Sequence, residues 1–392
     1  MSSLLTNASA MTALQTLSKI NADLSTTQGR ISTGLKVGDA ADNAAYWAIA
    51  TGMRSDASAL STVQEALGLG AAKVDTAYAG VDAAIEVIKE IKNKLITAQE
   101  PAADRAKIQA DITQLQQQLR GIAESASFSG ENWLQADLSG GAVTKSVVSS
   151  FVRDSAGNVS VKSIDYSLDT TTVLFDTTGD TAILDATTNI EGAAFTMSVN
   201  VGGVVSSYTV AAFTTDDVIA AGAGASTFDG EYANDGTLDY VKVAPDTWVA
   251  AVDQTTVADQ EVQFEDSGGG LWAVDVTASP TNITASVDTL TINTATTFTQ
   301  LDGMLQMVDD SLTNMTGAAS SLGSISKAID MQNTFISKLT DSLDRGIGRL
   351  VDADMEEESA RLSALQVQQQ LGIQALSIAN SSAQGILSLF RG

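Results

Sequence analysis

A seven-residue repeat of apolar side chains most constrains what this chain can fold into. Its longest run lies in the C-terminal half: Leu301, Val308, Met315, Leu322, Ile329, Ile336, Leu343 and Leu350. Such a repeat is typical of a helix that packs along a seam against another helix with left-handed supercoiling. A helix over 301–350 is about 75 Å long at a rise of 1.5 Å per residue. No compact domain needs so long a helix, so the repeat predicts a coiled-coil rod.

The N-terminal half carries matching repeats. One run continues for six positions: Leu60, Leu67, Val74, Val81, Ile88 and Leu95. A second run has Leu17, Leu24 and Ile31 seven apart, with Leu14 beside them, and ends at two glycines, Gly34 and Gly38. A shorter amphipathic helix is predicted over 108–122, after the Glu100-Pro101 break. The sequence therefore predicts long helices from both chain ends that share one helical core seam.

The middle of the chain, about 138–300, has a different pattern. Thr, Asp, Gly and Val dominate, and short alternating runs are separated by turn residues. Two runs over 195–201 and 204–211 flank Gly202-Gly203, which is a two-residue hairpin signal. The fold class expected is mostly α with an inserted β-rich domain, in which the middle of the chain forms one outer domain or two.

Charge separates the same regions. The chain has 47 acidic and 21 basic residues, which gives a net charge of −26, and residues 138–300 alone carry 21 acids and four bases. Most of the acidity therefore belongs to the β-rich insertion. An acidic chain of this kind disfavours nucleic acid and anionic membranes as partners, because both would repel it.

Both chain ends contain a long uncharged stretch. Residues 1–18 and 362–390 contain no charged side chain. The second stretch could span a bilayer by length, but six Gln, five Ser and one Asn interrupt it, so it is expected to be a packing helix without membrane insertion. Its apolar stripe includes Leu362, Ile373, Leu376, Leu387 and Phe390. Because such a helix has no strongly solvated face, we expect the ends to pair and to be buried in an assembly; a helical hairpin within one protein is the alternative.

The composition also limits the chemistry. The chain has no Cys and no His, so it lacks a catalytic triad, a thiol nucleophile and the imidazole or thiolate ligands of metals. Adjacent acids such as Asp216-Asp217 do not have the spacing of a calcium loop. We therefore expect no enzyme activity, no catalytic residues, no cofactor and no metal.

Two segments resemble the bacterial flagellin family. Ile31-Ser-Thr-Gly-Leu-Lys-Val-Gly-Asp-Ala-Ala-Asp-Asn43 is similar to its N-terminal signature, and Leu350-Val-Asp-Ala-Asp-Met-Glu356 to its C-terminal counterpart. The Gln-rich segment 366–374 and the ending Ile386-Leu-Ser-Leu-Phe390 also match. The Tyr46-Trp47 pair resembles the alphaproteobacterial, rhizobial-type members. The resemblance covers about 1–137 and 301–392.

The resemblance implies a division into concentric layers. Residues 1–40 and 351–392 would form inner-tube helices, 41–137 and 301–350 a surrounding helical shell, and 138–300 a surface-exposed variable domain. The inner-tube subunit interface would contain Leu14, Leu17, Leu24, Ile31, Leu362, Ile373, Leu376, Leu387 and Phe390. The helical core seam would contain Leu60, Leu67, Val74, Val81, Ile88, Leu322, Ile329, Ile336 and Leu343. The signature loops would contain Gly34, Asp42, Asn43, Asp352 and Asp354.

The function implied is that of a structural subunit of the flagellar filament used for swimming. The resemblance implies export of the unfolded chain through a type III apparatus and assembly outside the cell at the distal tip. Implied partners are other copies of the chain, alone or mixed with related flagellins, an export chaperone, the filament cap and hook-associated proteins. A hook–filament junction protein shares the paired ends and is the closest alternative, and an adhesin with a binding β domain is another.

Overall fold

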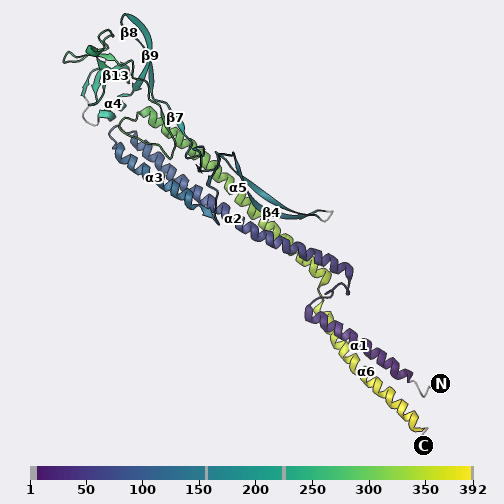
Figure 1. Cartoon of the computed structure of the whole chain (residues 1–392). Helices are drawn as coiled ribbons and strands as arrows, with labels where there is room; N and C mark the ends of the chain where they lie inside the picture. Colours follow the sequence, from purple (N-terminus) through teal and green to yellow (C-terminus); the bar gives the residue numbers. More distant parts are fainter. Residues whose placement is uncertain (1–6, 155–157, 223–226, 390–392) are drawn as a thin grey trace. The chain divides into compact units, whose positions relative to one another are not determined.

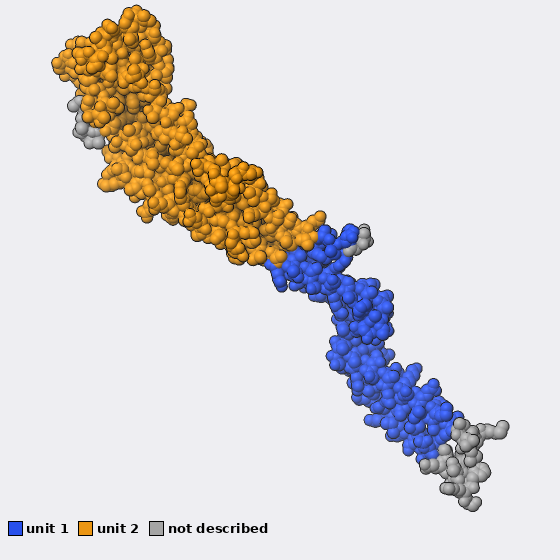
Figure 2. All heavy atoms as spheres, in the orientation of Figure 1, with its two compact units in different colours: residues 1–65, 150–160, 332–392 blue, residues 66–149, 161–331 orange. Residues whose placement is uncertain are grey.

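The structure is a computed structural model that describes residues 7–154, 158–222 and 227–389. Helices form both ends of the chain and strands form the middle (Figure 1), as predicted. The chain divides into two compact units: residues 1–65, 150–160 and 332–392 form unit 1, and residues 66–149 and 161–331 form unit 2 (Figure 2). The helices are α1 (Ala8–Thr33), α2 (Ala44–Ala98), α3 (Arg105–Ser125), α4 (Thr215–Gly222), α5 (Phe298–Val351) and α6 (Met355–Leu389).

The two longest repeats of seven residues belong to α2 and α5, of 55 and 54 residues, and the third run belongs to α1. In unit 2 the two helices run antiparallel, since Asp75 accepts a hydrogen bond from Ser326 and Lys92 pairs with Asp309 at 2.5 Å. Ten seam positions of unit 2 are buried: Leu67, Val74, Val81, Ile88, Leu95, Leu301, Val308, Met315, Leu322 and Ile329. In unit 1, Leu60 and Ile336 are buried and Leu343 is half-buried. Each fully buried side chain of this size stabilises the fold by about 1.5–3 kcal/mol.

Helix α3 and segments from the middle of the chain complete the core of unit 2. The side-chain amide of Gln116 donates to the carbonyl oxygens of Val287 and Leu290 at 3.0 and 3.1 Å. Arg120 donates to the buried carboxylate of Asp288, with 2.6 Å between Nε and Oδ1. Apolar residues of the connecting segments are fully buried there: Leu134, Leu168, Leu174, Leu184 and Leu290. Part of the insertion therefore packs on helices.

Short strands occupy the connections between these segments. They are β1 (Ser127–Phe128), β2 (Glu131–Asn132), β3 (Gln135–Ala136), β4 (Val143–Arg153), β5 (Val159–Leu168), β6 (Phe175–Asp176), β7 (Thr188–Ile190) and β16 (Ile283–Ala285). They form two-stranded ribbons: β1 with β2, β4 with β5, β7 with β16, and the parallel pair β3 with β6. The β7–β16 ribbon places residues 190 and 283 opposite each other, so the chain leaves and re-enters the helical core at one place.

The remaining strands form an eight-stranded sheet in unit 2. They are β8 (Ala194–Val201), β9 (Val204–Phe213), β10 (Thr227–Asp229), β11 (Tyr232–Asn234), β12 (Asp239–Ala244), β13 (Thr247–Asp253), β14 (Phe264–Glu265) and β15 (Leu271–Val274). The short 3₁₀ helix η1 covers Gln254–Thr256. The predicted hairpin is present, with φ of 62° at Gly202 and 82° at Gly203, because a turn of this kind needs left-handed residues. Helix α4 was not predicted; its Val218 is fully buried and packs in a cluster with Tyr240 and Trp248.

No helix within the described ranges is both long and apolar enough to cross a membrane.

Helix α2 offers a matched pair of glycines for a test of the packing in unit 2. A Cβ at Gly80 would lie 2.6 Å from Cδ1 of Leu134 and 2.8 Å from Cβ of Ala126, whereas at Gly68 it would meet nothing within 4 Å. We expect Gly68→Ala to stabilise the monomer by up to about 1 kcal/mol through helix propensity. We expect Gly80→Ala to destabilise it by about 1–3 kcal/mol, because the gain is outweighed by overpacking. Denaturant unfolding of both variants measures the difference, and equal stabilisation would contradict the packing described.

Candidate subunit interface

The candidate site is the pair formed by the first and last helices, α1 and α6. They lie side by side in unit 1 (Figure 1) and run antiparallel, since early residues of one helix meet late residues of the other. Asn7 donates to the carbonyl oxygen of Ala379 at 3.0 Å, and Gln369 donates to Oδ1 of Asn21 at 2.7 Å. Gly372 makes close packing possible, because a Cβ there would lie 3.2 Å from Cδ1 of Leu17.

The pair begins at a joint built from the two signature segments. Helix α1 ends at Gly34, whose φ of 70° is left-handed and whose N–H donates to the carbonyl oxygen of Arg30. The carbonyl oxygen of Gly34 accepts from the N–H of Ala353 at 2.9 Å, and Leu35 pairs with Asp352 in an isolated antiparallel bridge. Backbone hydrogen bonds thus join the N-terminal signature to the C-terminal one.

Three signature side chains organise the helix starts and the loop at the joint. Asp42 accepts from the N–H groups of Gly38 and Asp39, and these hydrogen bonds lower the pKa of its carboxyl because they favour the charged form. Asn43 accepts from two N–H groups in the first turn of α2, and Asp354 accepts from two in the first turn of α6. Asn43 and Asp354 therefore act as N-caps, which compensate for unpaired N–H groups at the start of a helix.

One ion pair crosses the joint inside unit 1. Nη1 of Arg30 lies 3.1 Å from Oε1 of Glu358, and the two side chains are 27% and 7% exposed. Arg361 lies 3.8 Å from the same oxygen, but its side chain is 53% exposed. No sequence signal linked Glu358 to Arg30, because the two residues are 328 positions apart.

The predicted interface residues fall into two sets. Leu17, Leu24, Ile31, Leu362 and Leu376 are half-buried within unit 1. Leu14 and Ile373 are exposed, at 60% and 54%, and further exposed apolar residues accompany them on the two helices: Met11, Val367, Leu371 and Ile378. Phe390 and the side chain of Leu387 lie outside the described residues. Sequence periodicity did not separate the side chains that pair α1 with α6 from those that face outward.

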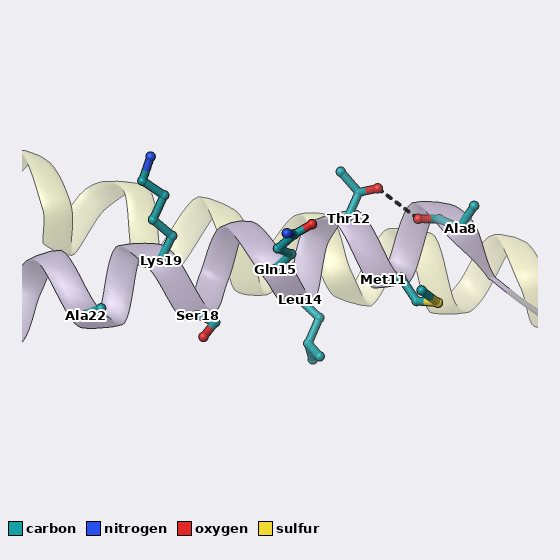
Figure 3. A pocket seen from close by; sticks show the side chains of 8 residues that line it. All are labelled: Ala8, Met11, Thr12, Leu14, Gln15, Ser18, Lys19 and Ala22. Atoms are coloured by element: carbon teal, nitrogen blue, oxygen red, sulfur yellow. Dashed lines mark hydrogen bonds between the residues drawn. The ribbon is translucent and has the colours of Figure 1, made fainter.

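A shallow hollow follows the outer surface of α1. It is lined by Ala8, Met11, Thr12, Leu14, Gln15, Ser18, Lys19 and Ala22. Leu14 and Ser18 project from one edge of the helix, and Thr12 and Lys19 from the opposite edge (Figure 3). Lys19 is the one charged residue among these eight. Four of the eight are apolar and four are polar or charged, and they offer no nucleophile paired with a base.

Other kinds of site find little support in the described part of the chain. Among residues 7–154, 158–222 and 227–389, no group of three or more acidic side chains is placed to hold a metal ion. The pair of α1 and α6 is therefore the candidate site, because large apolar side chains remain exposed on both helices.

The Arg30–Glu358 pair gives a direct test of how the two ends are held together. We expect Arg30→Ala to loosen the α1–α6 pair by about 1–3 kcal/mol, because the buried Glu358 carboxylate loses its closer partner and is left with Arg361 at 3.8 Å. Amide hydrogen exchange in both helices should then speed up by about fivefold or more. Arg361→Ala is the matched control and should change exchange little, since exposed ion pairs contribute about 0–1 kcal/mol. Equal effects of the two variants would contradict the assigned role.

Comparison with known proteins gives the family. The bacterial flagellin N-terminal helical region matches residues 4–138, and the flagellin C-terminal helical region matches residues 305–390. Flagellin A of Rhizobium meliloti strain 1021 is 61% identical over the full length of both chains. Flagellin C of that strain is 42% identical and a flagellin of Brucella melitensis biotype 1 is 36% identical, again with complete coverage of both chains. The chain belongs to the bacterial flagellin family and is a structural subunit of the flagellar filament.

Proposed function

We propose that the α1–α6 pair packs against the same pair in other copies and forms the innermost layer of the filament. Residues 1–40 and 351–392 would supply this inner tube, and residues 41–137 and 301–350 the helical shell around it. Residues 138–300 would supply the surface domain. We also propose that the seven-residue repeats of α2 and α5 wind as a coiled coil. The observation that carries the proposal is the exposure of large apolar side chains on two helices that lack charge over long stretches.

The exposed apolar surface of α6 is costly to leave in water. Within α6, residues 362–389 contain no charged side chain, and Val367, Leu371, Ile373 and Ile378 are 54–70% exposed. A helix without a charged face is normally buried. Each of these side chains contributes up to about 1.5–3 kcal/mol when another surface covers it completely. A charged residue in the same position would oppose assembly, because burial of an unpaired charge is costly.

The same proposal includes a route to the filament. The chain would cross the flagellar type III apparatus unfolded with the help of an export chaperone. It would then add at the distal tip beneath the cap and be joined to the hook by hook-associated proteins. The absence of Cys prevents disulfide cross-linking on the way, and only three Pro limit slow isomerisation during refolding. The filament would lie outside the cell and serve swimming.

Related flagellins are further candidate partners in the filament. Rhizobium meliloti has several similar flagellins, named A, B, C and D, so filaments that mix this chain with related flagellins are part of the proposal. A hook–filament junction protein shares paired ends, but similarity to flagellins over the full length favours the filament subunit.

A charge substitution tests the role of the paired ends. Ile373→Asp places a carboxylate on the exposed surface of α6, where the monomer can solvate it, so we expect an unchanged monomer that does not polymerise. Val204→Asp is the matched control, because Val204 is 64% exposed at the β8–β9 turn. Sedimentation after addition of filament seeds measures both. Sedimentation of Ile373→Asp at the wild-type level would contradict the proposal.

Two truncations test the division into layers. Removal of 138–300 would also remove the partners of Gln116 and Arg120, so the outer sheet is better removed as residues 194–279. The cut ends are close, since the N–H of Gly192 donates to the side chain of Asn282 at 3.1 Å. We expect this deletion to leave polymerisation largely intact and removal of 380–392 to abolish it. Electron micrographs of seeded samples distinguish the outcomes, and filaments from the C-terminal truncation would overturn the proposal.

A further inference from the structure

The first turns of α2 present large apolar side chains to solvent. Tyr46, Trp47 and Ile49 are 45%, 36% and 53% exposed. Every residue from 44 to 49 is exposed, and Ala50 is the first buried residue of the helix, at 1%. We call Tyr46, Trp47 and Ile49 the aromatic turn of α2.

The aromatic turn lacks the charges expected on a solvated helix surface. No charged residue occurs from Asn43 to Met53, and Arg54 is the first in α2. At about 100° per residue, the three side chains cover roughly 160° of the helix circumference. Surface helices normally place charged or polar residues over such an arc. The start of α2 therefore has the composition of a covered helix.

We propose that the aromatic turn is a contact with a second copy of this chain, separate from the α1–α6 surface. Tyr and Trp are enriched at the centres of protein interfaces, where their large area is buried at little cost in conformational entropy. The absence of charge points to another copy as the occupant. Two chains that each carry a net charge of −26 repel each other. The repulsion is smallest where the contacting surfaces have no charged side chain and no charged helix cap.

The position of the aromatic turn supports the same occupant. Asn43, which caps α2, belongs to the joint that leads directly into α1 and α6. The aromatic turn is therefore continuous along the chain with the surface proposed to contact other copies. This inference rests on the proposed function, since a second copy is available only in an assembled filament.

Tryptophan fluorescence tests the contact directly. Trp133 and Trp248 are 3% and 2% exposed and Trp272 is half-buried, so Trp47 is the most exposed of the four tryptophans. Acrylamide quenching of the wild type minus that of Trp47→Phe isolates the signal of Trp47. We expect this signal to be readily quenched in the monomer and protected in the filament to the level of the buried tryptophans.

A pair of variants gives the energetic counterpart. Tyr46→Ala combined with Trp47→Ala should lower the melting temperature of the monomer only slightly, since the two residues are 45% and 36% exposed and Ala favours a helix. The protein concentration left unpolymerised at equilibrium should rise about tenfold or more, which is the effect of losing a central aromatic contact. Leu238→Ala, at a 48% exposed position between β11 and β12, is the control and should leave that concentration unchanged.

The outcomes separate this inference from the function on which it rests. Failure of the wild type to polymerise overturns the proposed function. Filaments in which Trp47 remains as quenchable as in the monomer overturn the inference alone. The inference is also overturned if the double variant leaves unchanged the protein concentration that stays unpolymerised at equilibrium. This holds even if the double variant has lost a hook or cap partner. An equal effect of Leu238→Ala also overturns the inference, because the loss would then be a general effect of removing exposed apolar surface.

Discussion

Burial of apolar side chains at seven-residue intervals along α2 and α5 is the interaction on which the rest of the structure depends. In unit 2 the seam supplies a continuous apolar line, and α3 and the connecting segments pack on it. Close packing needs small residues where these segments cross the helices. A Cβ at Gly303 would lie 2.5 Å from Cγ2 of Ile190 in β7, and one at Gly80 would collide with Leu134. The helices therefore carry apolar residues at the seam and glycine at crossings.

Local patterns made much of this fold predictable. The seven-residue spacing is a property of one helix, so it correctly indicated long helices at both ends, and Gly202-Gly203 correctly indicated the β8–β9 turn. Interactions between distant residues were not predictable in the same way. The contact of Gln116 with the carbonyl groups of residues 287 and 290 leaves no trace in composition, and the buried network around Asp288 looked like ordinary surface acidity. For the same reason the extent of the insertion that packs on helices was visible only in the structure.

The candidate site shows the same division between local and distant information. Its capping residues, Asn43 and Asp354, are of types that favour helix starts, and the signature segments drew attention to them. The ion pair between Arg30 and Glu358 was not predicted, because two residues so far apart in the sequence leave no periodic pattern that links them. Leu17 is half-buried, whereas Leu14, three residues away, is exposed. This difference depends on where α6 lies, which the sequence pattern does not give. Charge was informative chiefly through its absence, first at the chain ends and then at the start of α2.

The pairing of the first helix with the last has a kinetic consequence. The hydrogen bond from Asn7 to Ala379 joins residues 372 positions apart, and that from Gln369 to Asn21 joins residues 348 apart. Contacts of such high sequence separation form late, because closing the intervening loop costs entropy before any contact can compensate for it. A chain that lacks its last helix cannot build the α1–α6 pair, whatever the state of its other helices. Formation of the α1–α6 pair is therefore delayed until the last helix of the chain is available.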